Sequence, residues 1–359
     1  MPDSLELVGI GEIAELTGVT KQAVANWRTR DADFPTPVAD LRSGPVWNVR
    51  DVITWAEGRG LALNLEPPQE VQENGGKRMA LTVAVVNMKG GVGKSTLTAN
   101  LGWYCGFKKN RRVLLVDLDP QFNLSQYAIG SQRYEELFVD KNKPTVLDVF
   151  EQHTPTAVSG VQKKSVSPAE VILSVKEWRA GGKLDLVASR LELAWTLKNP
   201  HQKEHLLAGF LKKVSKDYDL ILIDCAPTES MLTEAAYLAS KKVLVPVKPE
   251  FLSTIGLPLL IRSIENFQDR YDDRTVDLAG ILFNSSSNYK AEHERSKSFV
   301  SKIAKSRGWY VFSHEVSYSD SYPTGARMGK PIFLTDYARW WKVAEFDAVA
   351  EEFVGRLGL

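Results

Sequence analysis

The sequence is short of cysteine, of long apolar runs and of net charge, and each shortage excludes a class of protein. Its two cysteines, Cys105 and Cys225, have no metal-site spacing and suit buried thiols in a reducing compartment. No apolar run approaches the roughly 18 residues of a membrane-spanning helix, and the N-terminus is acidic where a signal peptide is basic. A net charge of +1 gives no global attraction for nucleic acid or membrane, so such a partner must bind a local patch. We therefore predict a cytoplasmic protein.

The chain divides at residues 61–78, LALNLEPPQEVQENGGKR, where Pro-Pro and Gly-Gly interrupt a polar stretch without a sustained period. Such a composition is typical of a linker. We predict a small domain over residues 1–60 and a large domain over residues 79–359.

The large domain contains short apolar runs that alternate with helical patterns. These runs are LTVAVVN, RRVLLVD, KLDLVAS, DLILID, KKVLVPV and VDLAGILFN. Several are apolar on both faces, as expected of parallel strands covered by helices on each side. The sequence therefore predicts a doubly wound, mostly parallel α/β sheet.

A glycine-rich loop, MKGGVGKST, joins the first of these runs to a helical pattern. Strand, loop and helix in this order predict a phosphate-binding loop rather than a chance turn. Gly90, Gly91 and Gly93 let backbone N–H groups curl around phosphate oxygens at the helix N-terminus. Lys94 is placed to reach the β/γ-phosphates of a nucleotide, and the Ser95 hydroxyl to ligate Mg²⁺.

The loop departs from the ordinary GxxxxGK[ST] consensus, because Met88 stands where the first glycine is expected and Lys89 follows it. The string KGGxGK[ST] resembles the deviant phosphate loop of the ParA/MinD family of ATPases. The resemblance implies that Lys89 crosses a homodimer interface to the ATP of the other subunit, much as an arginine finger does. It also places Val92 and Thr96 in the nucleotide-binding loop.

Three aspartates end two of the predicted strands. Asp117 and Asp119 lie in VDLDPQ, where strand alternation points both to one side at the carboxyl end of the sheet. The string resembles the DxDPQ segment of the family, which implies that Asp119 positions the attacking water and that Asp117 lies near Mg²⁺. Asp224 ends the run DLILID and is predicted to hold Mg²⁺ through water. An Asp-Pro pair is also common in plain turns.

The string LAGILFNSSS resembles a family segment whose asparagine hydrogen-bonds adenine, so the resemblance gives this role to Asn284. An asparagine that ends a strand is also a common turn former. The resemblance spans residues 79–359 with two departures. VAS at 187–189 replaces a proline–serine pair, and YPTGARMGKPI at 322–332 lacks a glutamate–alanine pair. Both leave the subfamily open.

The small domain has a helix–turn–helix pattern, with residues 20–29 as the predicted recognition helix. The segment that follows resembles the wing and closing helix of MerR-like or excisionase-like domains. Basic residues gather at Lys21, Arg28 and Arg30 and predict binding to operator DNA. Residues 1–60 nevertheless carry six basic and nine acidic residues, a net charge of −3, so dimerisation or partner docking stays open.

A second basic segment lies at residues 290–307, with six basic and two acidic residues on one predicted helix. ParA relatives coat the nucleoid through basic residues in their C-terminal region, so Lys297 and Lys302 are predicted to contact DNA phosphates without reading sequence. A plain solvated helix is the alternative. The C-terminal VAEFDAVAEEFVGRL is amphipathic but acidic, which argues against a membrane partner.

Together these features predict a partition ATPase. ATP and Mg²⁺ drive dimerisation, the dimer binds nonspecific DNA on the nucleoid, and a centromere-binding, ParB-like partner stimulates hydrolysis. The alternatives are a ParA-like protein that positions another cargo and a transcription regulator gated by ATP. A synthetase or an iron–sulfur ATPase of the same superfamily is a third class, and the latter is disfavoured because no cysteine pair suits a bridging cluster.

Overall fold

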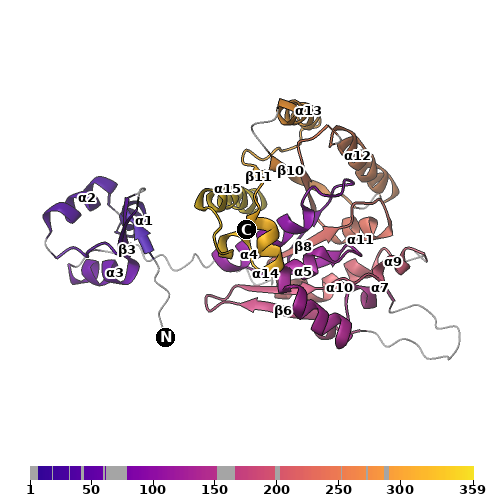
Figure 1. Ribbon diagram of the computed structural model, residues 1–359, viewed down its shortest axis with the longest axis horizontal. Coiled ribbons are helices and arrows are strands. Elements are labelled where there is room, and N and C mark those ends of the chain that lie inside the picture. Colours follow the sequence, from indigo (N-terminus) through magenta and orange to yellow (C-terminus); the bar gives the residue numbers. More distant parts are fainter. Residues whose placement is uncertain are drawn as a thin grey trace. The chain divides into compact units, whose positions relative to one another are not determined.

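The computed structural model divides into two compact units, Met1–Gly76 and Lys77–Leu359 (Figure 1). It describes residues 7–17, 19–31, 33–41, 44–59, 61, 79–151, 166–198, 203–251, 253–271, 274–286 and 291–359. The predicted linker lies outside the described residues except for Leu61, and Lys290 of the predicted basic helix lies outside them too. Within the described ranges, no helix combines the length and the apolar character needed to cross a membrane.

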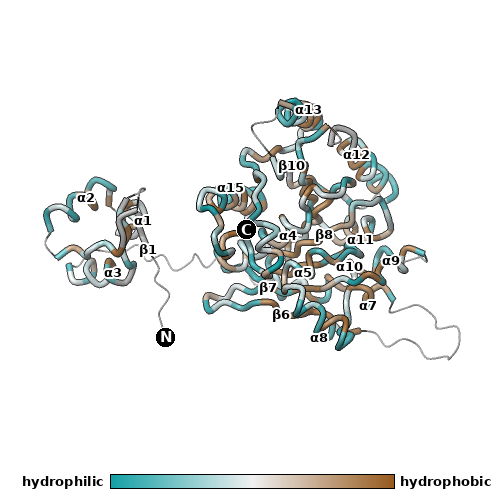
Figure 2. Tube along the Cα trace, viewed as in Figure 1, coloured by the Kyte–Doolittle hydropathy of each residue, from teal (hydrophilic) through white to brown (hydrophobic). Residues whose placement is uncertain are grey.

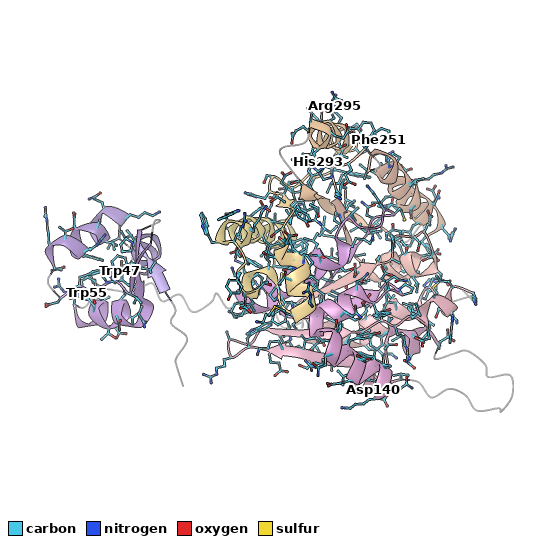
Figure 3. All side chains as sticks on the ribbon, viewed as in Figure 1. Trp47, Trp55, Asp140, Phe251, His293 and Arg295 are labelled. Atoms are coloured by element: carbon cyan, nitrogen blue, oxygen red, sulfur yellow. The ribbon has the colours of Figure 1, made fainter. Side chains whose placement is uncertain are left out.

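The N-terminal unit combines three helices with an antiparallel sheet of order β1-β3-β2. Its elements are β1 (Leu7–Gly9), α1 (Ile10–Thr17), α2 (Lys21–Arg30), β2 (Ala39–Leu41), β3 (Gly44–Asn48) and α3 (Val49–Gly58). The Thr20 hydroxyl caps α2 by accepting a hydrogen bond from the Ala23 N–H at 3.3 Å. Trp47 and Trp55 are buried in the interior (Figure 3). The winged helix–turn–helix assignment of this unit and its DNA-binding role both stay predictions.

The C-terminal unit is built on an eight-stranded sheet of order β11-β10-β9-β4-β8-β5-β7-β6. Its strands are β4 (Leu81–Val85), β5 (Arg112–Leu118), β6 (Ile172–Glu177), β7 (Lys183–Val187), β8 (Leu220–Cys225), β9 (Lys242–Val247), β10 (Asp277–Ser286) and β11 (Val316–Ser317). Neighbouring strands pair in parallel except β6 and β7, which are antiparallel. The sheet confirms the predicted mostly parallel α/β fold and adds one antiparallel edge.

Helices cover both faces of this sheet, because its strands are apolar on both sides. Leu114 and Val116 of β5 belong to a core with α7, α10, α11, α12 and α13, whereas Val113 and Leu115 belong to a core with α4, α5, α14 and α15. This alternation is the two-residue period of a strand. The central strands are mainly hydrophobic, while the outer side of α13 is hydrophilic (Figure 2).

The helices of this unit have the following bounds. They are α4 (Lys94–Lys108), α5 (Asn123–Ile129), α6 (Ser131–Tyr134), the π-helix η1 (Glu135–Asp140), α7 (Val146–Glu151), α8 (Pro168–Val171), α9 (Leu193–Thr196), α10 (Leu206–Val214), the 3₁₀ helix η2 (Ser215–Asp217), α11 (Met231–Ala239), α12 (Ser253–Arg270), α13 (Ala291–Ser306), α14 (Ser321–Met328), the 3₁₀ helix η3 (Ile332–Leu334) and α15 (Trp340–Leu357).

Candidate functional site

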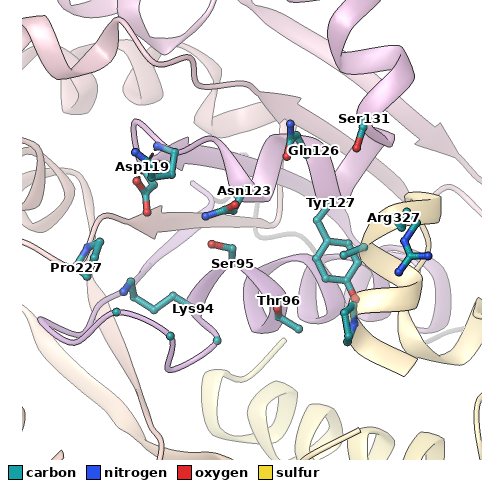
Figure 4. Close-up of a pocket in the computed structure, with 16 residues that line it drawn as sticks. Lys94, Ser95, Thr96, Asp119, Asn123, Gln126, Tyr127, Ser131, Pro227 and Arg327 are labelled. Carbon is teal, nitrogen blue, oxygen red and sulfur yellow. Dashed lines mark hydrogen bonds between the residues drawn. The ribbon is translucent and has the colours of Figure 1, made fainter. Parts of the chain in front are cut away.

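The predicted phosphate loop connects β4 to α4 and borders a cavity of about 570 Å³ (Figure 4). Gly91 and Gly93 have φ angles of +73° and +84°, in the left-handed region that favours glycine. No side chain caps α4, so its first N–H groups are available to an anion. The cavity is lined by Gly90, Gly91, Gly93, Lys94, Ser95, Thr96, Asp119, Gln121, Asn123, Gln126, Tyr127, Ser131, Pro227, Pro323, Ala326 and Arg327.

Lys94 is only 6% exposed, although it lines the cavity. Its Nζ donates to the carbonyl oxygens of Asn87 at 3.2 Å and Lys89 at 3.4 Å. Burial lowers the pKa of Lys94, and the nearby Asp224 carboxylate opposes this shift. The ammonium group is thus held across the loop, in the position from which a phosphate-binding lysine acts.

Asp224 and Asp117 lie opposite each other at the carboxyl ends of β8 and β5. Asp224 is fully buried, and neither of its carboxylate oxygens has a hydrogen-bond partner of good geometry among the described residues. Burial, followed by the charge of Asp117, raises the pKa of Asp224 well above its ordinary value, and the Ser95 hydroxyl opposes this rise. A buried carboxylate without such a hydrogen bond is stabilised by a cation bound beside it.

Asp117 is also fully buried, but its oxygens are occupied. Oδ1 accepts from the Asp119 N–H at 3.0 Å, and Oδ2 accepts from the Ser125 N–H at 2.8 Å and the Ser125 hydroxyl at 2.7 Å. Burial raises the pKa of Asp117 to about 7. This geometry ties the end of β5 to α5 and positions the Asp119 backbone. The predicted place of Asp117 near Mg²⁺ stays a prediction, and a metal contact would have to use the lone pairs that remain on its oxygens.

Asp119 is 7% exposed and lines the cavity at the same end as Lys94. Its Oδ1 accepts a hydrogen bond from the Gln121 N–H at 2.9 Å, which fixes the carboxylate over the turn. No hydrogen bond to Oδ2 occurs among the described residues. The side chain can therefore accept a hydrogen bond from a water molecule in the cavity.

The residues present fit Mg²⁺ bound together with a nucleotide. Within the described part of the chain, no three His, Cys, Asp or Glu side chains converge in a way that could hold a metal ion. Mg²⁺ in nucleotide sites takes few protein ligands and uses phosphate oxygens and water for the rest. The Ser95 hydroxyl at the cavity and the buried Asp224 carboxylate beside it could serve as such ligands.

Lys89, the second lysine of the loop, does not line this cavity. Its Nζ donates to Glu250 Oε2 at 3.0 Å, and its N–H donates to Asn87 Oδ1 at 2.9 Å. Glu250 also pairs with Lys248 at 2.5 Å. The Lys248 and Lys89 partners lower the pKa of Glu250, so the carboxylate stays charged. Within a single chain, Lys89 is therefore bound to an acid and does not line its own nucleotide site.

Asn284 lies beside the loop, at the end of β10, and is 5% exposed. Its Nδ2 donates to the Val92 carbonyl oxygen at 2.7 Å. A Cβ at Gly93 would lie 2.1 Å from that Nδ2, so a larger residue at this position would displace the Asn284 amide. Asn284 braces the loop and does not line the cavity, and its contact with adenine stays a prediction.

The predicted DNA-binding residues lie on two separate helices. Lys21, Arg28 and Arg30 are exposed on α2 of the N-terminal unit. On α13, Lys302 is exposed, whereas the Lys297 side chain is 15% exposed. Lys297 Nζ pairs with Glu294 at 3.1 Å and Glu315 at 2.8 Å. Arg295 projects outward from the same helix (Figure 3).

The structure adds site residues that the sequence reasoning missed. Glu250 holds Lys89, and Gln121, Tyr127 and Arg327 line the cavity. Arg327 lies in the YPTGARMGKPI segment, whose departure from the family pattern was the one available signal. Glu250 lies three positions after Val247, the end of an apolar run, but nothing in its local pattern marks it as the partner of Lys89.

Comparison with known proteins identifies relatives of this chain. A family profile described as an AAA domain matches residues 80–276. An uncharacterised protein of Mycobacterium tuberculosis is 31% identical over 308 residues, covering 84% of this chain and 88% of the relative. The chromosome-partitioning ATPase Soj of Treponema pallidum is 28% identical over 283 residues, covering 78% of this chain and 99% of Soj.

Solved structures share the fold. McdA from Cyanothece, without nucleotide, has a TM-score of 0.61 at 18% identity and covers 76% of this chain and 99% of its own. Cobyrinic acid a,c-diamide synthase from Mycobacterium smegmatis, with bound ADP and magnesium, has a TM-score of 0.58 at 24% identity, with coverages of 78% and 97%. Given the profile match, the relatives and the loop geometry, the chain belongs to the ParA/Soj/MinD family of ATPases.

Proposed function

We propose that this protein is a partition ATPase whose Mg²⁺–ATP-bound form is a homodimer that binds DNA and whose hydrolysis releases it. The observation that carries the proposal is the separation of the two loop lysines. Lys94 faces the nucleotide cavity, whereas Lys89 is bound by Glu250 outside it. A lysine that has no access to its own cavity suits action on a second subunit.

Within one subunit, the loop N–H groups and Lys94 bind and orient the phosphates. Ser95 and Asp224 hold Mg²⁺, which neutralises phosphate charge when bound. Asp119 positions the attacking water through its free oxygen, and Asp117 holds the Asp119 backbone in place. The cavity supplies positioning and charge but no strong base, so we expect slow basal turnover that a ParB-like partner accelerates.

Dimerisation requires Lys89 to exchange partners. It leaves Glu250 of its own chain and donates to a phosphate oxygen bound by the other subunit. Both members of the Lys89–Glu250 pair are partly exposed, with side-chain exposures of 21% and 35%, so the exchange faces only the modest barrier of a surface ion pair.

The DNA roles rest on charge. Exposed basic residues of α13, including Lys302, contact phosphates nonspecifically and keep the protein on the nucleoid. Lys21, Arg28 and Arg30 of α2 contact operator DNA. The cargo is a plasmid or chromosome, and positioning of another cargo or ATP-gated transcription control are the alternatives. Dimerisation or partner docking is the alternative for the N-terminal unit.

The separation of the lysines can be tested directly with Lys89→Ala. This variant should bind a fluorescent ATP analogue with nearly unchanged affinity but should fail to dimerise with ATP, as measured by light scattering. Lys248→Ala is the matched control, because Lys248 pairs with the same Glu250 from outside the loop. Loss of nucleotide binding in Lys89→Ala would place Lys89 in its own cavity and contradict the proposal.

A further inference from the structure

The nucleotide cavity has a second polar end, formed by helices rather than by the phosphate loop. Gln126 and Tyr127 come from α5, and Ala326 and Arg327 come from α14. Thr96 and Tyr127 lie between Lys94 and Arg327 (Figure 4). A nucleotide whose terminal phosphates sit in the loop extends past the start of α4, so this end of the cavity lies within reach of the rest of the molecule.

Two cations line the cavity, and their surroundings differ. Lys94 is buried and donates to two loop carbonyl groups. Arg327 is exposed, and among the described residues its guanidinium makes no hydrogen bond or ion pair. The neighbouring Lys330 lies outside the cavity lining and pairs with Asp336 at 3.4 Å. A guanidinium with five free donors is well suited to phosphate oxygens.

A buried asparagine ties the loop helix to α5 and to the segment that follows the Arg327 helix. Asn100 of α4 donates to the Thr96 carbonyl oxygen and to the Tyr127 hydroxyl, both at 2.8 Å. Its Oδ1 accepts from the Ile332 N–H at 2.7 Å, just after α14. These bonds use all of the polar atoms of the Asn100 side chain and join α4, α5 and η3. The chain is thus anchored to the loop helix five residues after Arg327, which limits the movement of the end of α14.

Close packing of α14 supports the same conclusion. A Cβ at Gly325 would lie 2.5 Å from the Lys330 carbonyl oxygen and 2.6 Å from Thr335 Oγ1. Gly329 ends the helix with a φ of +64°. A Cβ at this residue would lie 2.9 Å from the Gly130 nitrogen. The end of α14 therefore packs against the end of α5 with no room for a side chain at Gly329, and a movement of α14 away from α5 would break this contact.

We propose that Arg327 forms an anion subsite at this second end and donates to a nucleotide phosphate oxygen near the nucleoside, from the same subunit. The inference rests on the proposed ATPase function and adds a cis contact to it. It differs from the role of Lys89, which acts on the other subunit, and from that of Lys94, which belongs to the loop. Because Arg327 is exposed, it adds affinity rather than being indispensable.

The test measures nucleotide affinity on the full chain carrying Lys89→Ala, so that dimerisation does not contribute. Fluorescent analogues of ATP and ADP are titrated with Mg²⁺ into this parent and into Arg327→Ala, Arg327→Lys and Lys330→Ala. A lost charge-assisted hydrogen bond at an exposed site should weaken both nucleotides about tenfold in Arg327→Ala. Arg327→Lys should recover part of the affinity, and Lys330→Ala should match the parent.

Thermal unfolding of each variant checks that the fold is intact. Unchanged affinity for both nucleotides in Arg327→Ala overturns the subsite. If Arg327→Ala loses affinity for ATP but not for ADP, Arg327 contacts the terminal phosphate, and the proposed contact near the nucleoside is overturned. If Lys330→Ala loses as much nucleotide affinity as Arg327→Ala, the effect comes from the net charge near the cavity and not from a specific contact of Arg327, and the subsite is overturned. A parent chain that binds neither nucleotide sinks the proposed function itself, a result distinct from all of these.

Discussion

The phosphate loop and α13 both carry lysines, but the two regions hold them under opposite conditions. In the loop, Lys94 is buried and Lys89 is bound to Glu250, so each has a defined partner. On α13, Lys302 is exposed, whereas Lys297 forms ion pairs with Glu294 and Glu315. The comparison teaches that a count of basic residues does not measure a binding surface. Burial and local partners decide which lysines recognise one group and which contribute charge alone.

The largest expected effect lies at the loop cavity, in Asp119→Ala. Removing the group that positions water should lower turnover by about 10²–10⁴-fold while ATP still binds. The ATP-bound dimer should therefore accumulate, which size-exclusion chromatography with ATP detects. Turnover equal to that of the unmodified protein would remove Asp119 from the chemistry.

Lys94→Ala should come next, because it removes a buried charge that binds phosphate. We expect ATP affinity to fall about a hundredfold, the upper range for a charged hydrogen bond. Lys108→Ala is the matched control at the other end of α4, where Lys108 pairs with Asp347 at 2.7 Å. If the two variants bind ATP equally well, Lys94 contributes no more to nucleotide binding than a surface lysine, and the prediction is wrong.

Two lysines of α13, Lys297 and Lys302, should give a smaller effect that separates an exposed lysine from a paired one. Lys302→Ala should reduce the slope of the salt dependence of binding to a random duplex by about 1.8, because each dimer would lose two phosphate contacts. Lys297→Ala should leave the slope nearly unchanged, since Glu294 and Glu315 already neutralise this lysine. Filter binding over a salt series with ATP measures both. A larger slope change in Lys297→Ala would reverse the assignment.

Glu250→Gln should have the smallest effect. It removes the partner charge of Lys89 in the single chain and should favour ATP-dependent dimerisation by about two- to fivefold, as expected for a partly exposed ion pair. Analytical ultracentrifugation with ATP reports the shift, with Glu234→Gln as a control, because Glu234 of α11 pairs with Arg270 at the C-terminal end of α12 and with neither loop lysine. Weaker dimerisation would show that Glu250 also acts across the interface.

Much of the fold could be predicted from the sequence, since β4, β5, β8 and β9 are apolar on both faces. β6 was missed because it lies at the sheet edge and alternates with Ser174, Lys176 and Glu177, which are not buried. β11 has only two residues, too few to give a pattern.

The loop residues of the site were equally visible, because strand, glycines and helix are contiguous. The Lys89–Glu250 pair joins residues 161 positions apart, and no local pattern marks such a pair. Arg327 reaches the cavity through the packing of α14 on α5, which a single sequence does not encode in readable form. Long-range contacts were therefore the part that required the structure.

The antiparallel edge of the sheet has a consequence for the order of folding. β6 and β7 are joined by a short turn in which the Trp178 N–H donates to the Gly182 carbonyl oxygen at 2.9 Å, whereas each parallel pair must wait for a helix to cross over. Closing a short loop sacrifices little chain entropy. This hairpin can therefore form before the rest of the sheet, with Gly182 ready to pack against Gly106 of α4. The edge of the finished sheet would then be among the earliest parts of the chain to acquire structure.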